Sequence, residues 1–295
     1  MSDRMFGMNK WMKVLAYTVL GIYTVVVAYP ILFMFFTSFK SNKEFFVNLF
    51  GLPQNVEIMN YAKAWSVGKL GTYFGNSVVV TGVSVAVTTI VSLLGGYALA
   101  KLYIPKANLI MDAFMVFNFI PGIAIYISLY SMMSRMHLTG GRISLILPYI
   151  AWQIPFSMYI IKQYFETIPE ELIESGRIDG CTEFEAFFHI MLPLVKPAIA
   201  TIIVFTFIGN WGELMWANIT TASNALIKTL PVGLLNFKTE MGVEWGQYTA
   251  GICMVTLPLM LVFGYFQKYF VSGLTNGDNL TIKIMRGNAN EIYRL

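Results

Sequence analysis

Residues 76–100 read NSVVVTGVSVAVTTIVSLLGGYALA, a run of 25 residues that contains no Asp, Glu, Lys or Arg. A helix rises about 1.5 Å per residue, so about 20 apolar residues cross the roughly 30 Å hydrocarbon core of a bilayer. Because lipid offers the backbone no hydrogen-bond partners, such a run has to satisfy its own N–H and C=O groups as a helix. The stretch therefore predicts a membrane-spanning helix.

Five other stretches of the chain have the same length and character. The six predicted spans are residues 14–36, 76–100, 113–134, 143–161, 198–219 and 248–270. The first four lack Asp, Glu, Lys and Arg, the fifth contains Glu213, and the sixth contains Lys268 near its end. Several spans contain proline, which predicts kinks because neighbouring helices can satisfy the freed carbonyls. We expect an all-α fold, a polytopic bundle of six transmembrane helices that forms one domain over residues 1–295.

The composition of the whole chain agrees with a lipid environment. Hydrophobic residues make up 56% of the sequence and charged residues 12%, whereas soluble domains are about 25% charged. The net charge of +4 is dispersed over loops and forms no basic stripe, so we expect no nucleic-acid partner. Cys181 and Cys253 show neither the spacing of a disulfide framework nor that of a zinc site, and we expect no metal.

The distribution of basic residues predicts the orientation of the spans. An even number of spans places both termini on one side of the membrane. Arg4, Lys10, Lys13 and the short loop 101–106 mark that side as cytoplasmic by the positive-inside rule. The first apolar run has no small-x-small cleavage site, so we expect it to be retained as a span.

The polar interruption at residues 162–197 faces the cytoplasm in this topology. Residues 167–170 (TIPE) and 182–185 (TEFE) fit the capping-box pattern and predict two short helices. Gly176 and Gly180 are suited to end the first of them. In the second, aromatic and apolar side chains recur at the spacing of one helix face, namely Phe184, Phe187, Phe188 and Met191. This pattern fits either a docking surface for a soluble partner or a connector packed on its own spans.

Residues 174–180 read ESGRIDG and carry a resemblance to a known family. With Phe187, Pro193 and Pro197 downstream, they resemble the E-A-A-x-x-D-G signature of permease subunits of ATP-binding-cassette (ABC) importers. Residues 229–234 and 267–275 are similar to the maltose-type branch of sugar permeases, so the resemblance covers most of the chain. Two small residues replace the alanines of the signature, and the tail 276–295 departs from the short glycine-rich ending of that branch.

The resemblance implies a function and a set of partners. In that family the glutamate of the loop and the helix after it lie in a cleft of the ATPase. The resemblance therefore implies that the residues that couple this chain to the ATPase are Glu174, Gly176, Asp179, Gly180, Thr182, Phe184, Phe187 and Phe188. The implied partners are a homologous second permease, two copies of a cytoplasmic ATPase and an extracytoplasmic sugar-binding protein. The implied location of the chain is the bacterial inner membrane. The implied substrate is a sugar, and we expect an oligosaccharide.

The chain itself is expected to be neither an enzyme nor a nucleotide-binding protein. It contains no G-x-x-x-x-G-K-[ST] loop to hold phosphates, so ATP and Mg would be used by the partner ATPase and no cofactor by this chain. His137 and His189 lie in loops far from any Ser or Asp constellation, so we assign no catalytic residue.

A gradient-driven sugar carrier is the alternative function. Such carriers usually place ionisable residues inside their spans, and Glu213 is the one candidate here. Counted from Pro197 at 1.5 Å per residue, Glu213 lies about 24 Å along the fifth span, close to the outer interface. This position disfavours a proton relay at the midplane of the membrane.

Five residues are candidates for the translocation path. Residues 210–213 with Trp216 resemble a W-N-E-F stretch at the outer mouth in the same family. The candidates are Asn118, Asn210, Trp211, Glu213 and Trp216. For the two tryptophans an interfacial aromatic belt is the alternative role, and for Asn118 it is a hydrogen bond to a neighbouring helix.

Overall fold

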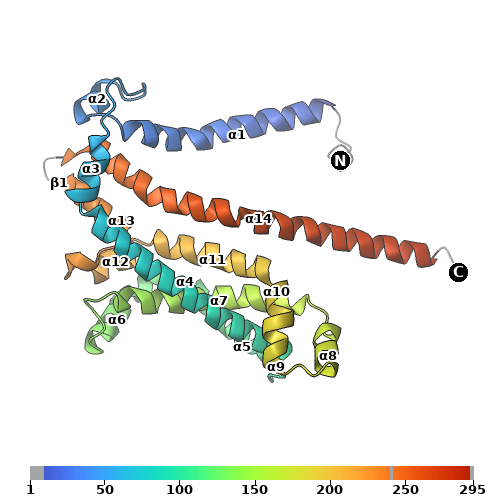
Figure 1. Ribbon diagram of the computed structural model, residues 1–295. Coiled ribbons are helices and arrows are strands. Elements are labelled where there is room, and N and C mark those ends of the chain that lie inside the picture. Colours follow the sequence, from blue (N-terminus) through green and yellow to red (C-terminus); the bar gives the residue numbers. More distant parts are fainter. Residues whose placement is uncertain (1–9, 240–241, 293–295) are drawn as a thin grey trace. The chain divides into compact units, whose positions relative to one another are not determined.

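The computed structural model describes residues 10–239 and 242–292, with side chains placed for residues 10–237 and 242–268 (Figure 1). The chain divides into two compact units, residues 1–71 with 234–256 and residues 72–233 with 257–295. The single-domain organisation expected from the sequence stays a prediction.

The described part of the chain is helical apart from one short antiparallel ladder, β1 (Lys238–Thr239) with β2 (Gly242–Val243). Among the described residues, four helical segments are long and apolar enough to cross a membrane. They are α1 (Lys10–Thr37), α4 (Leu70–Lys101), α7 (Ile143–Glu166) and residues Trp245–Lys268 of α14 (Trp245–Ile292). Two bent helix pairs meet the same criteria when taken together, which gives up to six spans. The all-α membrane fold is therefore confirmed.

The third predicted span, 113–134, is broken in its middle. Helix α5 (Ala107–Val116) runs into the 3-10 turn η1 (Phe117–Phe119), and the axis then bends by 96° before α6 (Gly122–Arg135). Pro121 causes the break because it has no N–H and disfavours helical backbone at the residue before it. Ile120 is accordingly extended, with ψ of 119°.

The fifth predicted span, 198–219, ends earlier than the sequence suggested. Helix α11 (Lys196–Trp211) stops at Trp211, and a separate short helix, α12 (Met215–Thr220), follows. The carboxylate of Glu213 lies between them and accepts the backbone N–H groups of Trp216 and Ala217 at 2.7 and 2.9 Å. A capped helix start at this point excludes a continuous helix to residue 219.

The first unit contains α1, α2 (Asn42–Val47), α3 (Met59–Ser66), η4 (Leu235–Phe237) and the first turns of α14. The most apolar window of α1 has no buried residue, as expected for a helix whose surface faces lipid. The loop after α1 is closed by polar contacts. Buried Lys40 donates through Nζ to the carbonyls of Asn48 and Leu49, and the Asn60 amide donates to the carbonyl of Lys40.

In the second unit α4 and α7 approach closely at Gly96. A Cβ atom at this position would lie 2.7 Å from Cγ2 of Ile161, so only glycine permits the observed spacing. Small residues are what allow the backbones of span helices to pack this closely. Elsewhere in the second unit, the Asn76 amide of α4 links three segments of the chain. It donates to the carbonyls of Leu226 and Lys228 and accepts from the guanidinium of Arg142.

Candidate functional site

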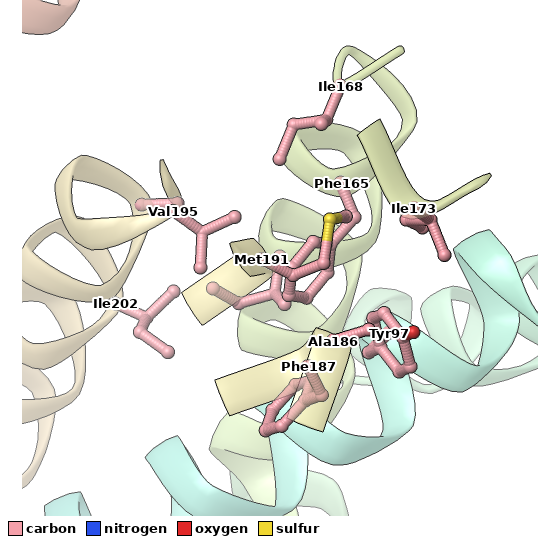
Figure 2. Packing of buried hydrophobic residues seen from close by; sticks show 11 residues of the cluster. Tyr97, Phe165, Ile168, Ile173, Ala186, Phe187, Met191, Val195 and Ile202 are labelled. Carbon is pink, nitrogen blue, oxygen red and sulfur yellow. The ribbon is translucent and has the colours of Figure 1, made fainter. Parts of the chain in front are cut away.

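The loop 162–197 contains α8 (Glu171–Ile178), α9 (Glu183–Glu185), the π-helical turn η2 (Ala186–Met191) and α10 (Leu192–Leu194). The two short helices predicted from the sequence are therefore present. A buried core fastens them to the spans (Figure 2), and its eleven members are Tyr97, Ile161, Phe165, Ile168, Ile173, Ala186, Phe187, Met191, Val195, Ala198 and Ile202. Because α4, α7, α8, η2 and α11 all contribute to it, the loop and three span helices share one packed core.

The second capping box of the loop is formed, and the first is not. The Thr182 hydroxyl accepts the N–H of Glu185, while the Glu185 carboxylate accepts the N–H of Thr182 at 2.8 Å. Thr182 lowers the pKa of Glu185, mainly through its backbone N–H and then through its hydroxyl. The capping box predicted at residues 167–170 is wrong, because the Thr167 hydroxyl instead donates back to the carbonyl of Tyr164 and α8 starts without a side-chain cap.

Two glycines shape the turn between the helices of the loop. Gly180 has φ of +88°, a conformation that L-residues avoid, so the sequence correctly identified it as the turn residue. Gly176 is buried, and a Cβ atom there would lie 2.5 Å from Cδ1 of Ile190. Its role is close helix contact, which sequence reasoning missed because helix propensity alone treats glycine as a weakening residue.

The expected apolar face of the second helix is divided between two sides. Phe187 and Met191 are buried, whereas Phe184 is 70% exposed and Phe188 is 41% exposed. The rings of Phe184 and Phe188 lie 4.6 Å apart, and the ring of Phe187 meets that of Tyr97 at 4.9 Å. A π turn holds more residues than an α turn, so positions three apart no longer share a face. The loop thus has an inner aromatic side in the core and an outer one in solvent.

Polar contacts also tie the loop to α4. Arg177 of α8 pairs with Glu183 of α9, with Nε 2.7 Å from Oε1, and the Tyr97 hydroxyl donates to the other carboxylate oxygen of Glu183 at 3.4 Å. Lys101 donates through Nζ to the carbonyl of Ile168 at 2.6 Å. The ion pair is half-exposed, so it adds little stability by itself.

The outer side of the loop combines acidic and apolar groups. Glu174, Asp179 and Thr182 of the loop are exposed, and so are the rings of Phe184 and Phe188. Ile178 adds a side chain that is 85% exposed, a signal absent from the sequence motif. An exposed apolar patch rimmed by charge is typical of a protein-docking surface.

The translocation-path candidates fall into two groups. Asn210, Trp211 and Trp216 are buried inside the second unit, and the Trp211 ring stacks on that of Phe207 at 5.3 Å. Asn118 is exposed in η1 and lines a hollow at the break of the third span. Asn118 is therefore the most exposed of the five candidates.

Glu213 has a structural role in the observed arrangement. Besides capping α12, its carboxylate accepts the hydroxyl of Tyr149 at 2.8 Å. Trp216, in turn, donates through Nε1 to the carbonyl of Ser144 at 2.9 Å and meets the ring of Trp152 at 5.7 Å. Glu213 and Trp216 thus brace an aromatic cluster. Trp152 was missed by sequence reasoning, although its place between the two prolines of α7 was a usable signal.

The loop presents acidic and aromatic side chains, and the hollow presents aromatic rings and one amide. Among the side chains placed at residues 10–237 and 242–268, no three His, Cys, Asp or Glu come together as metal ligands. The chemistry available at the site is recognition: an acidic and apolar protein surface at the loop, and an aromatic-lined hollow with an amide at the break.

Comparisons with known proteins agree with this arrangement. The family model described as "Binding-protein-dependent transport system inner membrane component" matches residues 92–276. A probable ABC transporter permease protein, YurM, of Bacillus subtilis is 33% identical over 88% of this chain and 86% of its own length. The arabinooligosaccharides transport system permease protein AraQ of Halalkalibacterium halodurans is 31% identical over 85% of this chain and 91% of its own length.

A solved structure shares the fold. A chain of a bacterial ABC transporter involved in the import of the acidic polysaccharide alginate superposes with a TM-score of 0.77 at 23% identity. The match covers 88% of this chain and 97% of that one. With the family match over residues 92–276 and the relative at 33% identity, the conclusion is direct: this chain belongs to the family of inner-membrane components of binding-protein-dependent transport systems, and it is an ABC transporter permease and not an enzyme.

Proposed function

We propose that this chain is one permease subunit of an ABC importer that passes an oligosaccharide, delivered by an extracytoplasmic binding protein, across the bacterial inner membrane. The observation that carries the proposal is the two-sided loop 162–197, fastened inside by a shared core and open outside as an acidic and apolar patch. Relatives named for arabinooligosaccharides, diacetylchitobiose and maltodextrin support the substrate class.

The outer side of the loop is the proposed ATPase contact. Glu174 is exposed in the isolated chain, so its carboxylate stays hydrated and has no desolvation cost there. In a desolvated cleft it would pair with a basic residue of the ATPase, and removing one partner of such a pair typically costs about 2–5 kcal/mol. Phe184 and Phe188 supply the apolar part of the same contact.

The inner side of the loop is the proposed mechanical link between the ATPase and the span helices. Phe187 and Met191 pack in the same core as Tyr97 of α4, Phe165 of α7 and Ile202 of α11. A packed core has few alternative arrangements, so displacement of the loop has to move these three helices together. ATP binding and release at the ATPase would in this way exchange inward and outward access.

The assembly around this chain is part of the proposal. It comprises a homologous second permease and two copies of a cytoplasmic ATPase, which binds ATP and Mg while this chain binds no cofactor. Both termini of the chain lie in the cytoplasm, which puts the loop 162–197 on the side where the ATPase is. A gradient-driven carrier is not favoured. Its one candidate for an ion or proton site, Glu213, already accepts three hydrogen bonds at the start of α12, from the Tyr149 hydroxyl and from the N–H groups of Trp216 and Ala217.

Uptake into proteoliposomes tests the proposal. The chain is reconstituted with its second permease, ATPase and binding protein, and the uptake of labelled maltotriose and diacetylchitobiose is followed with internal or external ATP. We expect accumulation only with ATP on the loop side, and none driven by a proton or sodium gradient. Accumulation that follows a gradient in ATP-free vesicles would establish the secondary carrier instead.

A further inference from the structure

The break in the third span forms a hollow of about 190 Å³ between η1, α6 and α7. Its lining includes Phe117, Asn118, Gly122, Tyr126 and Trp152. At about 30 Å³ for each water, it has room for about six waters, which is the scale of one ring and not of a whole oligosaccharide.

The hollow lies at membrane depth. Trp152 is about 14 Å from the start of α7 and about 21 Å from its end, at 1.5 Å per residue. Non-helical backbone at such depth is tolerated only where protein buries it or where it lines a hydrated cavity. Ile120 and Phe119, at the break, are 46% and 83% exposed in this chain, so the chain itself does not bury this backbone. The adjoining hollow can supply this backbone with water, which is one of the two conditions under which such a break is tolerated.

Two aromatic rings form one wall of the hollow and are held in place. The rings of Tyr126 and Trp152 lie 5.6 Å apart with 34° between their planes. Trp216 supports both, at 5.5 Å from Tyr126 and 5.7 Å from Trp152. Trp216 itself donates its backbone N–H to Glu213 and its Nε1–H to the carbonyl of Ser144, so both rings of the wall have a supported packing partner without any ligand.

The rest of the lining determines the kind of ligand. Among the described residues that line the hollow, none is charged. Asn118 contributes an amide, which offers both donors and an acceptor, and its recorded contact is a weak one to the sulfur of Met115 at 3.9 Å. An aromatic wall and an amide in one hollow suit a sugar ring, which has an apolar C–H face and hydroxyls at its edge. An acidic sugar would find no cation here to balance its carboxylate.

We propose that this hollow binds one neutral pyranose ring of the transported oligosaccharide, with the ring face on Trp152 and a hydroxyl at the Asn118 amide. The inference rests on the proposed function and adds to it a contact site and a neutral substrate class. Glu213 and Trp216 act here as positioning residues, since they hold the aromatic wall and do not touch the ligand.

Saturation-transfer NMR tests the proposal on the assembled permease and ATPase complex in lipid nanodiscs, without binding protein. The probes are maltotriose, diacetylchitobiose and a uronic acid trimer. We expect transfer to ring C–H protons of at least one neutral sugar, and none to the uronate. In Trp152→Leu the affinity should fall about tenfold, as for the loss of one aromatic stacking partner.

Matched variants keep the test independent of folding. Phe156→Leu is one turn further along α7 and outside the hollow, and Phe119→Leu is the neighbour of the exposed Asn118. Asn118→Leu should weaken binding while both controls leave it unchanged, and thermal midpoints identify any variant that misfolds. The proposal fails if Trp152→Leu and Asn118→Leu bind like their controls, if the uronate binds as well as the neutral sugars, or if no sugar binds. ATP-driven uptake in the proteoliposome assay would survive each of these failures, so the proposed function is judged separately.

Discussion

Replacing Phe187 with alanine should loosen the loop from the spans, whereas the same change at Phe184 should not. The two positions are three residues apart and share a face in an ideal α-helix, but Phe187 is 5% exposed and Phe184 is 70% exposed. Removing a core phenylalanine costs about 3–5 kcal/mol. Full burial of a phenylalanine contributes about 1.5–3 kcal/mol, so the small buried part of Phe184 contributes less than about 1 kcal/mol.

Thermal unfolding of the detergent-solubilised chain measures the first half of this prediction. At about 2–4 °C per kcal/mol, Phe187→Ala should lower the midpoint by at least about 6 °C and Phe184→Ala by less than about 4 °C. Binding of the ATPase measures the second half. Phe184→Ala should weaken it about tenfold, as expected for an exposed aromatic side chain that becomes buried in an interface.

Equal destabilisation by the two variants would refute the two-sided loop. It would mean that Phe184 and Phe187 share one buried face, as a regular α-helix would have, and that the loop is a connector packed on its own spans. Unchanged ATPase binding in Phe184→Ala would separately remove the outer side from the proposed contact.

Three further predictions concern caps and turns. Gly180→Ala should destabilise the folded chain by about 1–2 kcal/mol because φ at this position is +88°. Gly82→Ala is the control and should not destabilise it, because a Cβ atom there meets nothing within 4 Å. The thermal midpoints of the two variants measure the difference. The pKa of Glu185 is lowered in the folded chain, so its ionised carboxylate stabilises the fold fully above the ordinary pKa of about 4.3. This stabilisation is lost as the pH falls through the lower folded-state pKa. Glu185→Gln should therefore make the thermal midpoint less dependent on acid pH. Glu213→Ala should cost at least about 2 kcal/mol in denaturant unfolding through loss of the α12 cap and of the Tyr149 contact, and Glu213→Gln, which keeps an acceptor, should cost less.

The membrane helices could be predicted because their signal is local. An uncharged run such as 76–100 has one stable conformation in lipid, whatever packs against it. The breaks were harder to place. Pro121 predicted a kink but not a bend of 96°, and the end of the fifth span depended on Glu213 accepting two backbone N–H groups, which a hydropathy window cannot detect.

The candidate site was predictable where one motif determines it and not where distant segments meet. The capping box at Thr182 and the turn at Gly180 are local, and both are present. The division between Phe184 and Phe187 comes from a π turn, and sequence spacing alone does not reveal such a turn. Trp152 joined the site only through contacts between different helices, which are tertiary facts.

The most direct test of the account compares two acidic residues of α8, Glu174 and Glu171. Both are exposed in the isolated chain, so alanine at either position should change its unfolding free energy by less than about 0.5 kcal/mol. The measurement is the ATP hydrolysis of the reconstituted complex that is stimulated by sugar-loaded binding protein. The account predicts that Glu174→Ala abolishes the stimulation and that Glu171→Ala retains it. Full stimulation in Glu174→Ala, with normal subunit stoichiometry, would contradict the assignment of this loop to ATPase coupling.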